Sequence, residues 1–73
     1  MDYTNKKFTL EDGKIYIVIE QVDYEDNTYL YIVNRNDEDD SKFVQIKNDE
    51  LLDIDPDLLE SKLFPLFVEK IIK

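Results

Sequence analysis

Residues 8–19 read FTLEDGKIYIVI, in which Asp12 and Gly13 stand between two β-prone runs. An Asp-Gly pair in this setting is the strongest short-range hairpin signal, because both central residues of a type I′ turn need positive φ. We therefore predict two antiparallel strands joined by a two-residue turn at Asp12-Gly13. A turn of that length places Phe8 opposite Ile17.

Downstream of this hairpin, β-prone runs alternate with acidic turns. The second strand continues to about Val22, and two more strands are predicted at residues 28–33 and 42–47. Residues 47–54 fit either a short edge strand or an irregular link. The expected sheet is a four-stranded antiparallel β-meander over residues 8–47, in which each strand pairs with the next along the chain.

Side-chain parity predicts which residues face the core, because a register slip of one residue moves every side chain to the opposite face. If the loop after the second strand has an even number of residues, the isoleucines and leucines share one face. That face consists of Phe8, Leu10, Ile15, Ile17, Ile19, Leu30, Ile32 and, by extension, Val44 and Ile46. Because this set is almost purely apolar, we predict that it forms the core.

The opposite face of the predicted sheet carries tyrosines and other apolar side chains. Its candidate partner-binding residues are Tyr16, Val18, Tyr29, Tyr31, Val33 and Phe43. One interpretation is that they are solvent-facing positions chosen for cross-strand packing. The other is that they form a surface for a protein partner or a second copy, because apolar patches rich in tyrosine are typical of interfaces.

The C-terminal segment, residues 55–73, is predicted to be helical. Asp55 is suited to cap the helix and is followed by a proline at the first helical position. An apolar stripe at helical spacing then follows, so the segment should cover the predicted core face. Pro65 lies inside it, and an interior proline removes a backbone hydrogen bond. We expect a kinked helix, or two short helices at residues 56–63 and 65–72.

Composition limits both the fold and the chemistry. At 73 residues there is room for one small α+β domain over residues 1–73, with residues 1–7 expected to be flexible. Hydrophobic residues make up 42% of the chain, which favours a folded domain over a disordered acidic tail. The chain has no cysteine and no histidine, so thiol and imidazole chemistry are excluded. We predict no enzyme activity, no catalytic residue and no cofactor.

The net charge of −9 is concentrated in the middle of the chain, where Arg35, Lys42 and Lys47 are the only bases between Glu20 and Glu60. Direct binding to nucleic acid or to an anionic membrane is therefore not expected. The N-terminus has no apolar run, and no stretch approaches the roughly 20 apolar residues of a membrane span. We predict a cytoplasmic protein.

The acidic run at residues 34–40 invites comparison with a calcium-binding loop. It lacks the required glycine, because Asp39 stands at the sixth position, and Gln45 stands where a bidentate glutamate is needed. A single glycine in the whole chain also leaves no phosphate-cradling loop. We predict no metal site.

Residues 8–47 resemble the YrzB-like family, small acidic proteins of Firmicutes and their phages whose activity is not characterised. The resemblance is carried by FTLEDGK at residues 8–14, then Tyr16, Val18, Tyr24, Tyr29-Leu30-Tyr31 and the acidic turn at residues 37–40. It implies a small cytoplasmic domain and supplies no catalytic or binding residue. The segment around Pro65 departs from the family pattern.

Two functions remain open from the sequence. The first is a non-enzymatic protein-interaction module that uses the tyrosine-bearing sheet face or a free strand edge, with a homodimer as one form of it. The second is an acidic mimic of nucleic acid, encoded by a phage or mobile element, that inhibits a nuclease or another nucleic-acid-binding protein. The acidic surface for the second function would be Glu25, Asp26, Asp37, Glu38, Asp39 and Asp40.

Overall fold

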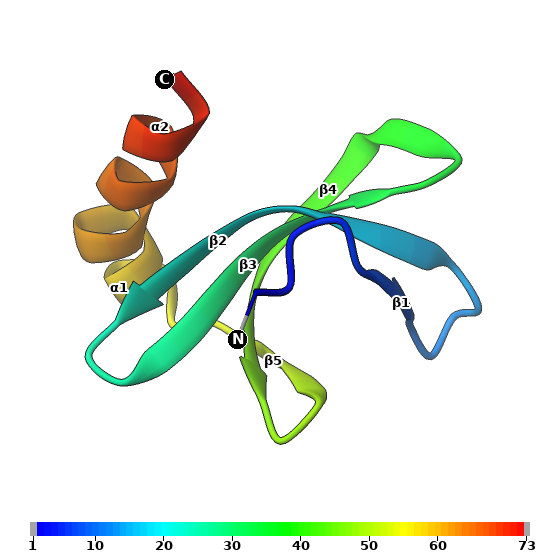
Figure 1. The fold of residues 1–73 in the computed structure, drawn as a ribbon, viewed down its shortest axis with the longest axis horizontal. Coiled ribbons are helices and arrows are strands. Elements are labelled where there is room, and N and C mark those ends of the chain that lie inside the picture. Colours follow the sequence, from blue (N-terminus) through cyan, green and yellow to red (C-terminus); the bar gives the residue numbers. More distant parts are fainter. Residues whose placement is uncertain (1, 73) are drawn as a thin grey trace.

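The computed structural model describes residues 2–72, and it has an α+β fold with one antiparallel sheet and a C-terminal helical segment (Figure 1). Five strands follow one another in the order β1-β2-β3-β4-β5: β1 (Lys7–Thr9), β2 (Ile15–Tyr24), β3 (Asn27–Asn34), β4 (Asp37–Lys47) and β5 (Glu50–Asp53). The predicted meander is confirmed. The segment left open in the sequence contains the fifth strand, and the sheet curls into a half-barrel.

The helical segment is one kinked helix, made of α1 (Pro56–Leu58), the π-helical turn η1 (Leu59–Leu63) and α2 (Phe64–Ile72). Asp55 caps it as predicted, because its carboxylate accepts a hydrogen bond from the Asp57 N–H at 2.9 Å. The wide turn lies just before Pro65, and the Phe64 N–H reaches back five residues to the carbonyl of Leu59. A π turn at this place accommodates a proline, which cannot continue the ordinary hydrogen-bond ladder.

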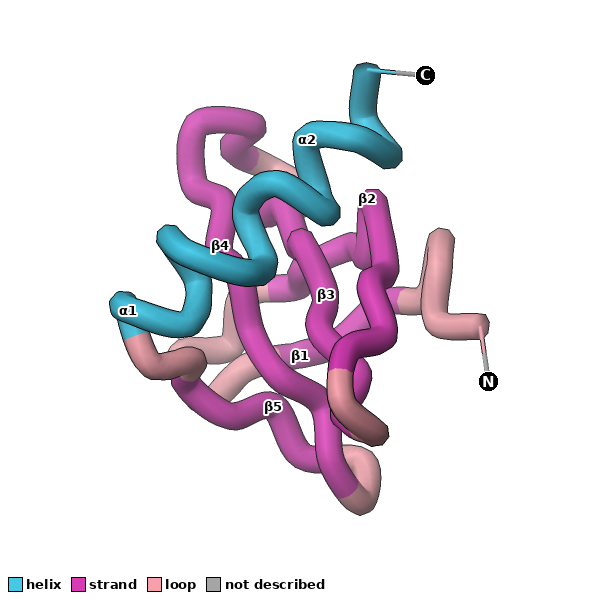
Figure 2. Tube along the Cα trace, turned by 90° about the vertical axis from the view of Figure 1, so that its left-hand side faces the viewer, coloured by secondary structure: helices cyan, strands magenta, loops and turns pink. Residues whose placement is uncertain are grey.

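Two separate apolar clusters lie on the two faces of the sheet. We call the first the inner core; its buried members are Tyr16, Val18, Leu30, Ile32, Val44 and Ile46. We call the second the helix core; its buried members are Val22, Tyr29, Leu63 and Phe67. Figure 2 shows the helical segment lying across the face of the sheet that carries the helix core. The sheet is therefore buried on both faces.

The first hairpin differs from the prediction by one residue. Phe8 pairs with Tyr16 instead of Ile17, because the loop has three residues and not two. The Gly13 N–H bonds to the Leu10 carbonyl at 2.9 Å, and Gly13 alone in this loop has a positive φ, of 79°. This is a type I turn followed by a left-handed residue, the usual form of a three-residue hairpin. The extra loop residue places Phe8 opposite Tyr16, on the face of the sheet that carries the inner core.

A β-bulge at Ile19 changes the facing of the second strand. Val18 pairs with Ile32, whereas Glu20 pairs with Tyr31, so Ile19 has no partner of its own. The extra residue turns the strand over, and alternate residues before and after it face opposite sides of the sheet. Val18 and Val22 are both even-numbered positions of β2, yet Val18 points into the inner core and Val22 into the helix core.

The bulge explains why part of the predicted core is wrong. The loop after β2 is even as assumed, a two-residue turn at Glu25-Asp26 with both φ values positive. The register that this turn sets holds only as far as the bulge. Beyond it the isoleucines predicted to be core are displaced, and Ile19 is 43% exposed. Ile15 and Ile17 are half-buried and belong to neither cluster.

The helical segment covers the face opposite to the predicted one. Phe43 lies at the centre of the contact: its ring stacks on Tyr31 with centroids 4.8 Å apart and meets the edge of Phe67 at 4.9 Å. Lys70 adds a polar contact by donating to the backbone carbonyl of Gln21 at 2.6 Å. The tyrosine-bearing face offers large aromatic area, which is what a helix rich in leucine and phenylalanine can bury. Assigning that face to solvent is wrong.

Candidate functional site

The tyrosine-bearing residues proposed from the sequence do not form one exposed surface. Tyr16 and Val18 are fully buried in the inner core, and Tyr29 is 2% exposed in the helix core. Tyr31 and Phe43 are half-buried and pack against the helix core, and Val33 is half-buried. The six residues lie on two faces of the sheet, because the bulge at Ile19 separates Tyr16 and Val18 from the others. The prediction of an exposed tyrosine-bearing face is therefore wrong.

The acidic residues proposed as an alternative surface are mostly exposed. Glu25 and Asp26 form the turn between β2 and β3, and Asp37, Glu38 and Asp39 open β4. Asp40 is the exception, because it is half-buried and accepts hydrogen bonds from the Tyr16 hydroxyl at 2.6 Å and the Asn34 amide at 3.1 Å. This carboxylate is engaged inside the fold.

Tyr16 and Asp40 are coupled electrostatically. The hydrogen bond to Asp40 raises the pKa of Tyr16 to about 12, and burial adds to this effect. The same hydrogen bond, with that from Asn34, lowers the pKa of Asp40 below its ordinary value. Lys14 adds a longer contact to the Asp40 carboxylate at 3.9 Å. The pair ties β2 to the start of β4 and offers no free group for chemistry.

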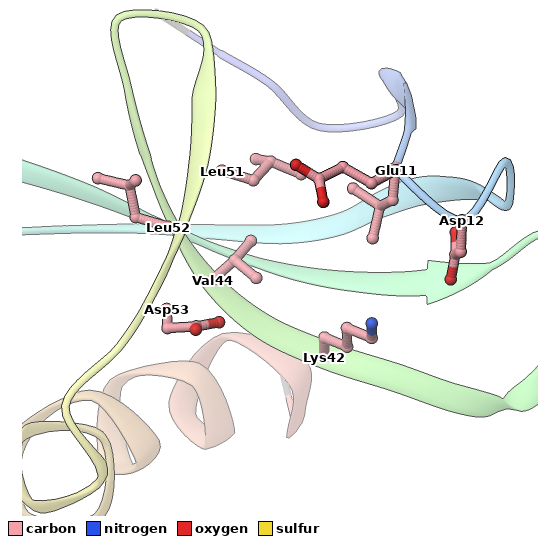
Figure 3. Close-up of a pocket in the computed structure, with 8 residues that line it drawn as sticks. Glu11, Asp12, Lys42, Val44, Leu51, Leu52 and Asp53 are labelled. Atoms are coloured by element: carbon pink, nitrogen blue, oxygen red, sulfur yellow. The ribbon is translucent and has the colours of Figure 1, made fainter.

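A groove lies between the first hairpin and the last strand, at the opening of the half-barrel (Figure 3). One part, of about 340 Å³, is lined by Leu10, Glu11, Asp12, Lys42, Val44, Leu51, Leu52 and Asp53. The adjoining part, of about 430 Å³, is lined by Phe8, Thr9, Leu10, Glu11, Asp49, Glu50 and Leu51. The two parts adjoin, because both are lined by Leu10, Glu11 and Leu51, and we refer to them together as the groove.

The floor of this groove is apolar and its rim is acidic. Leu10 and Leu51 lie against the inner core, and Val44 belongs to it. The rim carries the carboxylates of Glu11, Asp12 and Asp53, and further along those of Asp49 and Glu50. Lys42 is the basic residue among those that line it, and its ammonium nitrogen lies 5.2 Å from the centre of the Tyr16 ring. The groove therefore has a negative rim over an apolar floor.

Strands β1 and β5 are the two edges of the sheet, and each flanks the groove. In β5, Glu50 and Asp53 are exposed and Leu52 is 39% exposed. Lys47 and Glu50 close a two-residue turn whose residues, Asn48 and Asp49, both have positive φ, as in a type I′ hairpin. Exposed edges of this kind are usually protected by charges.

Ladder geometry fixes which backbone groups of β5 face outward. The pair that closes a two-residue hairpin is hydrogen-bonded, and the pairs then alternate along the ladder. Leu51 and Asp53, which oppose Ile46 and Val44, therefore belong to the pairs that are not hydrogen-bonded to β4. Their N–H and C=O groups are therefore directed to the free edge, while their side chains face the groove (Figure 3). Leu52 points to the other side of the strand in the same view.

Sequence reasoning did not find this groove. Its residues come from segments at 8–12, 42–44 and 49–53, which the curl of the sheet brings together. Within residues 2–72, no group of three or more Asp or Glu side chains is arranged to hold a metal ion. No helix in that range is long and apolar enough to cross a membrane.

No family model, curated protein or solved structure matches the chain. The resemblance of residues 8–47 to the YrzB-like family stays a prediction.

Proposed function

We propose that this protein is a non-enzymatic interaction module that binds an extended segment of a partner protein along the free edge of β5. The observation that supports this proposal is the unpaired edge at Leu51 and Asp53 beside a groove with an apolar floor. An extended segment added to a sheet edge gains affinity from main-chain hydrogen bonds and specificity from alternate side chains. The groove supplies a place for those side chains.

A second copy of the chain is a poorer occupant than a different protein. Pairing β5 with β5 would bring Glu50 and Asp53 of two molecules close together, and like charges on opposed strands are destabilising. The net charge of −9 adds repulsion between whole molecules. The proposed partner is therefore a different chain.

The test uses synthetic peptides of about eight residues, the length of a typical strand. Valine alternates with threonine in them, and one position that faces the groove carries lysine, glutamine or glutamate. Binding is followed by NMR titration of the isotopically labelled full chain. We expect saturable shifts of the Leu51, Leu52 and Asp53 amides with at least one peptide, with a dissociation constant below about 1 mM. No saturation by any of the three would refute the proposal.

Backbone pairing has its own control. Methylating the peptide nitrogens that face β5 removes donors to the strand edge, and methylating the intervening nitrogens leaves these donors in place. We expect the first peptide to lose binding and the second to keep it. Equal binding of both peptides, or equal loss, would contradict edge pairing at β5.

The acidic-mimic interpretation predicts a different result. The triple variant Asp37→Asn, Glu38→Gln, Asp39→Asn neutralises exposed carboxylates that lie outside the groove. We expect it to bind the peptides like the native chain. If it loses binding while variants of the groove keep it, the acidic surface replaces the strand edge as the site.

A further inference from the structure

We propose that the groove selects a partner segment in which an apolar residue and a basic residue stand two positions apart, the apolar one opposite Leu51 and the basic one opposite Asp53. This inference rests on the function proposed above and specifies the chemistry of the partner. It follows from the order of side chains on β5, from the lining of the groove and from the charge of its rim.

The spacing comes from the strand itself. Leu51 and Asp53 lie on the same face of β5, because they pair with Ile46 and Val44, which both belong to the inner core. An added strand places its residues directly opposite those of the edge, with side chains alternating between the two faces. The residues that meet Leu51 and Asp53 are therefore separated by one residue whose side chain points away from the groove.

The apolar position is defined by the floor. Leu51 packs against the inner core from the edge, and Leu10, from the hairpin, packs against the same core and lines the same groove. A side chain opposite Leu51 would contact both leucines and extend the inner core. Valine, isoleucine or leucine suits such a half-buried strand position.

The basic position is defined by a carboxylate that forms no ion pair. Asp53 is exposed, faces the apolar Val44 across the ladder, and forms no ion pair within residues 2–72. Among the described residues the ion pair is that of Lys14 with Asp40, neither of which belongs to β5. Glu11 and Asp12 add negative charge across the groove from Asp53 (Figure 3). Lys42 also lines this part of the groove, with its ammonium over the Tyr16 ring, so three carboxylates face one cation and the net charge is negative. Lysine or arginine in the partner would complement this charge, and an acidic segment would be repelled.

The experiment compares the lysine, glutamine and glutamate peptides on the native chain and on Asp53→Asn and Asp53→Lys. We expect the native chain to bind lysine over glutamate by about fivefold or more, since cross-strand pairs of opposite charge attract and those of like charge repel. Asp53→Asn should remove most of this preference. Asp53→Lys should reverse it.

Asp26→Asn is the matched control. It removes the same charge from an exposed turn that lies outside the groove, and asparagine tolerates the positive φ of 67° at this position. The peptide preference should be unchanged in this variant. A loss of preference as large as that in Asp53→Asn would show a general effect of net charge and would overturn the assignment to Asp53.

The outcomes separate this inference from the proposed function. If all three peptides bind the native chain equally, with loss on methylation of the nitrogens that face β5, edge pairing stands and the selection rule is refuted. If none binds, the proposed function fails first. Repeating the titrations at about 50 and about 500 mM salt should shrink the lysine preference, because the carboxylates of the rim are exposed and screened.

Discussion

The inner core and the helix core lie on opposite faces of one sheet, and they are covered in different ways. The helix core is closed by Leu63 and Phe67 from the helical segment. The inner core has no helix in its cluster and is covered by the curl of the sheet, with Phe8 and Leu51 from the two edge strands packed against it. A cover made from two unpaired strand edges leaves a groove between them.

This difference shows how a small chain can bury both faces of a sheet with a single helix. One face uses an added element, and the other uses the ends of the sheet itself. The helix core is covered by a helix, which presents no unpaired strand edge. The inner core is covered by residues of β1 and β5, the two edge strands of the sheet, and for this reason we place the candidate site there.

The largest expected effect comes from breaking the helix core. Phe67, on the side of α2 that faces the sheet, is 1% exposed, whereas its neighbour Val68 is 46% exposed. Phe67→Ala should lower the free energy of unfolding by about 3–5 kcal/mol, and Val68→Ala should change it by less than about 1 kcal/mol. Urea unfolding followed by circular dichroism measures both. Equal effects at the two positions would show that the helix does not pack as described.

The next effect tests the inner core and the bulge together. Ile32 is fully buried, so Ile32→Ala should cost about 2–5 kcal/mol of unfolding free energy. Ile19→Ala should cost less than about 1 kcal/mol, because the bulge leaves that side chain 43% exposed. The same urea titrations apply. A large cost at Ile19 would instead support the register without a bulge.

A smaller effect is expected in the hairpin that joins β1 to β2. Gly13 has a φ of 79°, and no atom lies within 4 Å of the place where a Cβ would stand. Gly13→Ala should therefore cost about 1–2 kcal/mol from backbone strain alone. Gly13→Asn should cost less, because asparagine enters the left-handed region more readily. Thermal unfolding of the two variants measures these costs. An alanine variant as stable as the native chain would contradict the three-residue loop.

The mildest effect is a pH dependence that belongs to the inner core. The folded state raises the pKa of Tyr16 to about 12, so the stability that this group contributes is complete below its ordinary pKa, near 10, and is lost between about pH 10 and 12. Asp40 has a lowered pKa, so its contribution is lost as pH falls through and below its ordinary value near 3.8. Tyr16→Phe should reduce both dependences.

Unfolding free energies of the native chain and the phenylalanine variant, measured across the acidic and alkaline ranges, test this coupling. NMR titration of the Asp40 carboxyl carbon gives an independent measure. Its pKa should rise in the variant, because the largest cause of the shift is the hydrogen bond from Tyr16. An unchanged carboxyl pKa would contradict the Tyr16–Asp40 contact.

Local features of the fold were predictable wherever a single residue type decides the backbone conformation or its hydrogen bonds. Asp55 was predicted as a helix cap and caps it, and Pro65 was predicted to kink the helix and follows a wide turn. The even loop after β2 was also anticipated, and it is the Glu25-Asp26 turn. Each depends on hydrogen bonds or φ values within a few residues, so the sequence carries the information locally.

The candidate site was predictable only in part. A free strand edge was expected from a meander, and β5 provides one. Its position beside Leu10 and Glu11 was not expected, because those residues are some forty positions away in the sequence and meet β5 only through the curl of the sheet.

By itself the sequence determined an antiparallel meander, a capped and kinked C-terminal helix and an acidic middle segment. Only the tertiary structure decided which side chains face which core. Both alternations of these strands are apolar, so neither Tyr16 nor Ile17 is marked by its type as the buried one. A bulge at Ile19 or one more residue in the Gly13 loop reverses the facing, and the choice rests on packing between distant segments, which local sequence does not encode.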